Sequence, residues 1–144
     1  MKPIFGNKIT NMDYQVRKGA YAVIFNATGD KVLSVHNKGY HFLPGGGIEN
    51  NENEKGCIER EMLEETGFQA EVGPFIGQAF FYFISSKDEY ILSDGYFYRA
   101  RLMEKLQNPI EKDHQMEWIH VKDMDKLFFY QHQVWAVKEA LKSI

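Results

Sequence analysis

The stretch of sequence that decides the fold is GGIENNENEKGCIEREMLEETGF, residues 46–68. Its second half predicts a helix over residues 54–66, with Asn53 as the N-cap and Gly67 just beyond the last turn. The helix has an apolar stripe that can pack on a core, formed by Ile58, Met62 and Leu63.

Three glutamates, Glu61, Glu64 and Glu65, crowd the last two turns of this helix. The helix dipole places partial negative charge at that end, so each acid there costs about 0.3–1 kcal/mol. Like charges three or four residues apart cost about 0.2–0.5 kcal/mol more for each pair. A divalent cation over this face would turn the repulsion into affinity. Because all these ligands are oxygen atoms, the cluster predicts Mg2+ or, alternatively, Mn2+ rather than zinc.

The chain as a whole has the size and composition of a globular protein, and we predict a single domain over residues 1–144. Of its 144 residues 44% are hydrophobic and 15% aromatic, so a substantial core is expected. The net charge of −3, without a run of Lys or Arg, argues against nucleic acid as the main partner. No apolar run suits a membrane span or a signal peptide, and the single Cys57 agrees with a reducing compartment. We therefore expect a cytoplasmic protein without membrane contact.

Strand patterns lie on both sides of the predicted helix. Residues 1–14 are expected to form an irregular arm or a short edge strand. A hairpin of residues 20–25 and 31–35 and a strand at 40–43 follow, and Gly45, Gly46 and Gly47 then open a loop. After the helix we predict strands at 68–72, 76–84, 95–102 and 117–121, and helices at 122–129 and 133–142. This order favours a mixed β-sheet with helices on its faces, an α/β fold.

The spacing of glycines and charges in residues 46–68 resembles the Nudix box, the motif of the MutT-like Nudix hydrolases. Five residues separate Gly46 from Glu52, and seven more lead to Arg60-Glu61. Glu64-Glu65 and Gly67 complete the pattern, and only Phe68 stands where the motif has an aliphatic residue. The preceding sequence FLPGG and the later Glu117-Trp118-Ile119 also resemble this family.

The resemblance implies an α/β/α sandwich with a mixed β-sheet and helices on both faces. It also implies a pyrophosphohydrolase that cleaves a nucleoside diphosphate linked to some group X, usually with Mg2+. By position, Glu61, Glu64, Glu65 and the backbone carbonyl of Gly45 would be metal ligands. Glu61, or failing that Glu64, would accept the proton of the attacking water. Glu52 and Arg60 would brace the helix against the loop, and Gly46 and Gly47 would bind substrate.

Residues outside the motif are candidates for completing the site. Glu111 is the first choice for a further metal ligand or base, because it lies in a polar segment that precedes a predicted strand. Asp113 and His114 are the alternatives, and otherwise all three are surface loop residues. Asp94 is the next place to look. Arg17 is a candidate for contacting a substrate phosphate, or else it pairs with a surface acid.

Aromatic side chains alternate along two predicted strands, so most should be core and one or two are candidates for stacking on a base. These are Phe80, Phe81, Tyr82, Tyr96 and Tyr98. We expect His132 and Trp135 to pack the last helix on the sheet, and Cys57 to be a buried small side chain.

Two other functions stay open at this point. One is a non-catalytic nucleotide-sensing domain, although the intact set of three glutamates argues against it. The other is hydrolysis of capped RNA or an isoprenoid diphosphate, of which the RNA version is weakened by the lack of a basic track. The expected partner is a small nucleoside diphosphate derivative, and group X and a homodimeric state are left undecided.

Overall fold

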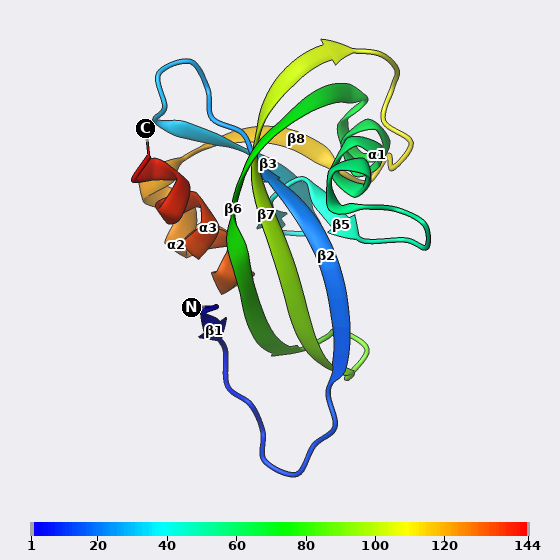
Figure 1. The fold of residues 1–144 in the computed structure, drawn as a ribbon, viewed down its shortest axis with the longest axis vertical. Helices are drawn as coiled ribbons and strands as arrows, with labels where there is room; N and C mark the ends of the chain where they lie inside the picture. Colours follow the sequence, from blue (N-terminus) through cyan, green and yellow to red (C-terminus); the bar gives the residue numbers. More distant parts are fainter. Residues whose placement is uncertain (1, 144) are drawn as a thin grey trace.

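The computed structural model describes residues 2–143 and contains two β-sheets with helices packed around them (Figure 1). The larger sheet has the strand order β1-β6-β7-β2-β5, and the smaller sheet has the order β4-β3-β8. The elements are β1 Ile4–Phe5, β2 Gln15–Val23, β3 Lys31–Asn37, β4 Tyr40–Phe42, β5 Gly45–Gly47, α1 Glu54–Thr66, β6 Phe68–Ile84, β7 Tyr90–Lys105, β8 Gln115–His120, a 3-10 turn Val121–Asp123, α2 Met124–Leu127 and α3 Gln131–Leu141. The larger sheet joins parallel and antiparallel pairs, so the predicted mixed sheet is confirmed.

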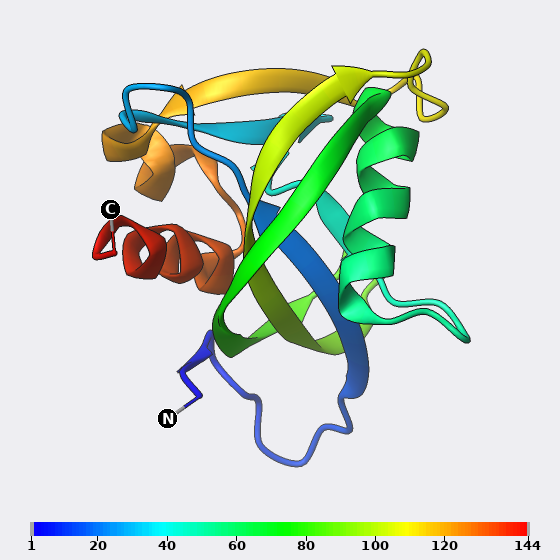
Figure 2. The ribbon, with the colours of Figure 1, turned by 45° about the horizontal axis from the view of Figure 1, so that its top comes forward.

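Helices cover both faces of the larger sheet (Figure 2). Alternate residues of β2 pack on opposite faces of the sheet, because successive side chains of a strand point in opposite directions. Ala20 and Ala22 pack with Cys57 and Met62 of α1, whereas Val23 packs in the core that contains α3. The structure therefore confirms the predicted α/β class and the buried position of Cys57. No helix of residues 2–143 is both long and apolar enough to cross a membrane.

Helix α1 has the predicted limits. The side chain of Asn53 accepts a hydrogen bond from the Gly56 N–H at 2.7 Å and caps the first turn. Gly67 ends the helix with a φ of 78° and donates its N–H to the Leu63 carbonyl at 3.0 Å. At the other end of the chain, His132 is fully buried between α3 and the sheet, as expected.

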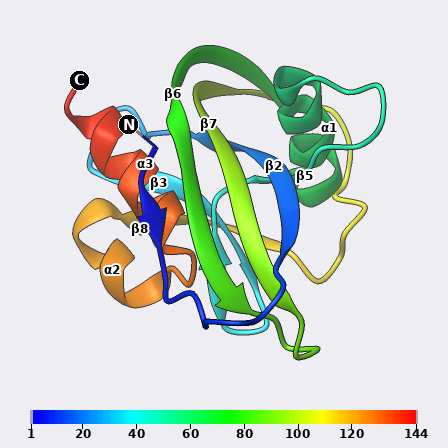
Figure 3. The same ribbon diagram turned by 60° about the horizontal axis from the view of Figure 1, so that its bottom comes forward.

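Several predicted strands need correction. Residues 68–72 and 76–84 form one long strand, β6, whose pairing with β7 slips near Pro74, between Val72 and Gly77. A proline cannot donate to a sheet ladder, so the strand continues through an irregularity rather than ending. Strand β7 begins at Tyr90 rather than near 95, and the short β1 pairs in parallel with β6 (Figure 3).

The predicted hairpin of residues 20–25 and 31–35 exists only near its turn. The Leu33 N–H donates to the Ile24 carbonyl at 2.8 Å, but β2 and β3 then diverge into different sheets. Gly45–Gly47, predicted to open a loop, instead forms β5 and pairs with β2. The helix predicted at 122–129 is a 3-10 turn followed by α2, which ends at Leu127, and α3 begins at Gln131.

Candidate active site

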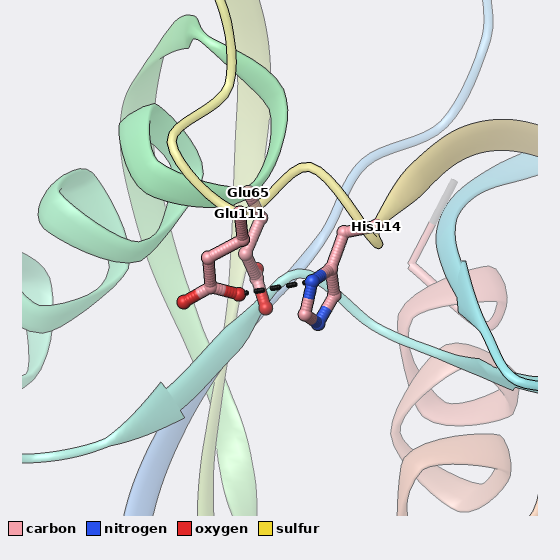
Figure 4. Close-up of side chains that lie close together, drawn as sticks. All are labelled: Glu65, Glu111 and His114. Atoms are coloured by element: carbon pink, nitrogen blue, oxygen red, sulfur yellow. Dashed lines mark ion pairs between the residues drawn. The ribbon is translucent and has the colours of Figure 1, made fainter.

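Two segments far apart in the sequence bring a group of carboxylates together. The end of α1 supplies Glu61, Glu64 and Glu65, and the loop between β7 and β8 supplies Glu111 and His114. Ligand atoms of Glu61, Glu64 and Glu111 lie within 4.8 Å of one another, and so do those of Glu65, Glu111 and His114. Figure 4 shows the second set, with all three side chains pointing toward a common centre. We call these five residues the carboxylate cluster.

The loop reaches the cluster because its backbone completes the end of α1. Helix C-termini leave carbonyl groups without partners inside the helix. The Glu64 carbonyl accepts from the N–H groups of Ile110 at 2.9 Å and Glu111 at 3.0 Å. The Gly67 carbonyl accepts in the same way from Leu106 and Gln107. The position of the Glu111 side chain is thus set by hydrogen bonds to the helix that carries the other glutamates.

Glu65 is the most deeply buried member of the cluster, with 3% of its surface exposed. One carboxylate oxygen accepts a hydrogen bond from the Gly45 N–H at 3.0 Å. Burial raises the pKa of Glu65 well above its ordinary value, and the nearby Glu61 and Glu111 raise it further. Within residues 2–143, no Lys or Arg pairs with this carboxylate. A buried acid without a cation is costly, so this position is suited to a bound positive charge.

Glu61 lies beside the glycine strand β5. A Cβ atom on Gly46 would collide with the Glu61 carboxylate, so glycine is needed for this close approach. Burial raises the pKa of Glu61 to about 7, against the opposing effect of Arg60, with Glu64 and Glu111 adding to the rise. A carboxylate with a pKa close to neutral is suited to accepting a proton at physiological pH.

Arg60 connects the loop before α1 to the cluster. Its Nε donates to Glu52 at 2.6 Å and its Nη2 to the Gly47 carbonyl at 3.1 Å. This pairing holds the pKa of Glu52 at about 2. The Arg60 Nη1 also donates to Glu61 and to Glu64, each at 3.0 Å, which the sequence did not predict. These contacts have the geometry that a brace between loop and helix requires.

The cluster has the chemistry of a site for a hard divalent cation. Four carboxylates meet there, and Arg60 neutralises only part of their charge. Oxygen ligands of this kind suit Mg2+ and Mn2+, and the His114 imidazole adds a nitrogen that Mn2+ tolerates better. The N–H of Gly45 is directed to Glu65, and its carbonyl stays a predicted ligand. The Gly46 and Gly47 carbonyls accept from the Cys57 Sγ at 3.4 Å and 3.5 Å, and Gly46 also lies against Glu61.

The other candidates from the sequence are placed differently. His114 belongs to the cluster, with its Nδ1 at 3.1 Å from Glu111, but Asp113 is exposed and in neither ligand set. Asp94 also lies outside both sets and accepts a hydrogen bond from Gln78 on β6 at 2.7 Å. Arg17 is half exposed and pairs with Glu89 at 3.3 Å.

A cavity of about 470 Å³ lies next to Arg17, and most of the residues in its wall were not predicted from the sequence. Its aromatic lining comes from β4, the end of β6 and the segment before α3: Tyr40, Phe42, Phe83, Phe129 and Tyr130. None of the five aromatic residues considered for base stacking lines it. These segments share no sequence motif. The feature that could have pointed to the cavity is that its aromatic residues lie next to predicted turns and at the ends of predicted elements.

Comparison with known proteins agrees with this architecture. The profile of the NUDIX domain matches residues 15–138. A NUDIX hydrolase from Nitrosomonas europaea superimposes with a TM-score of 0.73 at 15% identity, over 90% of both chains. A MutT NUDIX hydrolase from Burkholderia pseudomallei gives 0.65 at 21% identity, over 87% of this chain and 98% of the other. An ADP-ribose pyrophosphatase from Streptococcus suis gives 0.65 at 20% identity, over 88% and 92%. No curated protein sequence matches the chain significantly.

Proposed function

The chain belongs to the NUDIX domain family and is a Nudix-type pyrophosphohydrolase, and we propose that it cleaves a nucleoside diphosphate linked to a group X with Mg2+ or Mn2+. The observation that carries this proposal is the meeting of Glu111 with Glu61, Glu64 and Glu65, the last of them buried and without a cationic partner in residues 2–143. We also propose a cytoplasmic location, on the ground of the single buried Cys57.

The residues of the cluster divide the work in this proposal. When bound, a divalent cation screens the charge of the diphosphate and acidifies a water molecule. Glu61, Glu64, Glu65, Glu111 and the Gly45 carbonyl would hold it. Glu61 accepts the proton of the attacking water, which its pKa of about 7 favours, and Glu64 is the alternative acceptor.

The remaining candidates position the substrate or the site. Arg60 and Glu52 keep the loop in register with α1 through their paired hydrogen bonds. Gly46 and Gly47 allow the diphosphate to approach the cluster closely because they carry no side chain. Arg17 is the basic residue that we assign to the anionic part of the substrate, since its pairing with Glu89 is exposed and weak.

Group X can be identified by a substrate screen. Purified protein is incubated with nucleoside triphosphates, ADP-ribose, sugar nucleotides and dinucleoside polyphosphates in Mg2+, and released phosphate is measured after phosphatase coupling. We expect hydrolysis of at least one compound, complete loss in EDTA and recovery with Mg2+ or Mn2+. Full activity in metal-free buffer would contradict the proposed role of the cluster.

The glutamates can be tested with the best substrate of that screen. Glu61→Gln and Glu64→Gln should each lower turnover at least about 100-fold, the low end for loss of an acid–base group. Glu59→Gln is the matched control, because Glu59 is exposed on the same helix. Near-normal turnover in both variants would contradict the catalytic roles of Glu61 and Glu64, whereas no turnover of any compound by the wild type would favour a nucleotide-sensing domain.

A further inference from the structure

We propose that the aromatic cavity beside the carboxylate cluster binds the nucleobase of the substrate, which stacks on Phe83. We call it the base cavity. The inference rests on the proposed function, because it names the binding site for the part of the substrate that lies away from the diphosphate. Its lining combines aromatic rings with a few polar groups, the usual composition of a site for a small organic ligand.

Contacts on two sides place the base cavity next to the cluster. Phe42 lines the cavity and packs edge-on against His114, with ring centroids 5.6 Å apart. On the other side, Tyr130 lines the cavity and contacts His132, whose ring also meets that of Tyr21. Tyr21 pairs with Gly45, and the Gly45 N–H donates to Glu65 of the cluster. A substrate whose diphosphate lies on the carboxylates can therefore extend its terminal group into the cavity.

The wall offers ring faces and edges at the spacing of aromatic contacts. Phe83 lies 5.7 Å from Phe129 and 5.5 Å from Tyr130, measured between ring centroids, and both rings meet it edge-on. Tyr40 and Phe129 expose 56% and 39% of their surface at the rim. A volume of about 470 Å³ is within the range of small-ligand sites. Phe81 stacks on one face of Phe83, with ring centroids 5.5 Å apart, so a planar base would stack on the other face of this half-buried ring.

The polar groups of the cavity favour a base over a hydrocarbon chain. The amide oxygen of Asn37 is buried and has no hydrogen-bond partner among the described residues. Ser85 and Ser86 also line the wall. A prenyl chain would leave these groups without partners, which is unfavourable, whereas the N–H edge of a base can satisfy an amide oxygen. Arg17 at the same cavity can leave its weak pairing with Glu89 for a sugar or phosphate oxygen.

The test compares ligands that differ only in the base. AMP, GMP, CMP and UMP are titrated into the protein with Mg2+ by calorimetry, and ribose 5-phosphate serves as the ligand without a base. We expect at least one nucleotide to bind about tenfold or more tightly than ribose 5-phosphate. Phe83→Leu keeps an apolar side chain but removes the ring, and should weaken that nucleotide about 5- to 100-fold. It should leave ribose 5-phosphate unchanged.

Two further variants secure the interpretation. Phe83→Trp should restore nucleotide affinity because it restores a ring, which separates lost stacking from a folding defect. Phe75→Leu is the matched control, because Phe75 lies on the same strand, is 51% exposed and is outside the cavity. It should bind like the wild type.

The inference is overturned if nucleotides and ribose 5-phosphate bind equally in the wild type, or if Phe83→Leu weakens both to the same extent. Tighter binding of geranyl monophosphate, which carries the same single phosphate, than of every nucleotide would likewise overturn it, in favour of a prenyl site. The proposed function fails by a separate result, the absence of hydrolysis of any diphosphate with Mg2+. Nucleotide binding in the base cavity is measured independently of that outcome.

Discussion

At the scale of single residues, Glu65 has the environment that most clearly supports the proposed metal site. It is buried, it accepts one hydrogen bond from Gly45, and no cation among the described residues compensates it. Its raised pKa means that the folded protein binds this proton more tightly than the unfolded chain does. In the absence of metal, stability from this group is therefore present at low pH and lost as the pH rises.

Glu65→Gln should remove this pH-dependent loss of stability. In metal-free buffer the wild type should lose stability relative to the variant as the pH rises above about 4.3, by up to about 1.4 kcal/mol per pH unit. In saturating Mg2+ the wild type should regain about 2.7 kcal/mol at 100 times its Kd, and the variant should not. Urea unfolding at several pH values measures both effects. If Mg2+ raises the stability of Glu65→Gln as much as that of the wild type, Glu65 is not a metal ligand.

Glu111 is the second residue whose role can be isolated. Glu111→Gln should weaken Mn2+ binding and lower turnover about 10- to 1000-fold, with little change in stability, because its backbone hydrogen bonds to Glu64 are kept. Asp113→Asn should behave like the wild type, since Asp113 lies outside the cluster. His114→Ala tests whether the imidazole contributes to Mn2+ affinity. A silent Glu111→Gln beside a damaging His114→Ala would reassign the role within the loop.

At the scale of elements, the site depends on how the β7–β8 loop sits on the end of α1. Gly67 is central to this contact, because its positive φ ends the helix and its carbonyl accepts from Leu106 and Gln107. A Cβ atom at this position would collide with the Gln107 carbonyl. The position of the Glu111 side chain therefore depends on the contact between the end of α1 and the β7–β8 loop.

Gly67→Ala should therefore damage two properties at once. The left-handed backbone alone should cost about 1–2 kcal/mol of stability, and the displaced loop should reduce affinity for Mn2+. Gly73→Ala is the control, since Gly73 lies on β6 without a positive φ and with more room. Thermal unfolding and Mn2+ titration measure the two properties. Lost stability with unchanged Mn2+ affinity would show that the loop keeps its place without this glycine.

At the scale of the whole molecule, His132 lies in the core between α3 and the larger sheet. Its Nε2 is 3.1 Å from the Ser93 Oγ, and its ring stacks on Phe81 and meets Phe97 edge-on. Burial lowers the pKa of His132 to about 3. The unfolded chain takes up a proton near pH 6.5, which the folded protein excludes until much lower pH. Stability from this group is therefore full above pH 6.5 and falls as the pH decreases toward 3.

His132→Gln should flatten this part of the pH profile. Between pH 6.5 and 4 the wild type should lose about 1.4 kcal/mol per pH unit more than the variant. Comparing the two proteins in the same metal-free buffer cancels the opposite contributions of Glu61 and Glu65, whose pKa values are raised. Urea unfolding at intervals of half a pH unit is the measurement. Parallel profiles would mean that the imidazole is protonated in the folded core.

The sequence by itself determined the parts of this protein that depend on local spacing. The limits of α1 follow from Asn53 and Gly67, because a cap and a left-handed residue act within one turn. The shared face of Glu61, Glu64 and Glu65 follows from the helical repeat. The mixed sheet and the helices on its two faces followed from the order of the strand and helix patterns. The errors are at Pro74 and at β5, where pairing with a neighbouring strand keeps the backbone extended although the local residues favour a break or a loop.

Only the tertiary structure decided which distant segments meet. In the sequence, Glu111 is one of two acids in a polar loop. In the structure, carbonyl groups at the end of α1 accept hydrogen bonds from this loop and fix its position. The divergence of β2 and β3 into separate sheets, and the assembly of Phe42, Phe83 and Tyr130 around one cavity, leave no local pattern in the chain. Contacts of this kind come from hydrogen bonds and packing between elements far apart in sequence, so they exist only once the whole chain has folded.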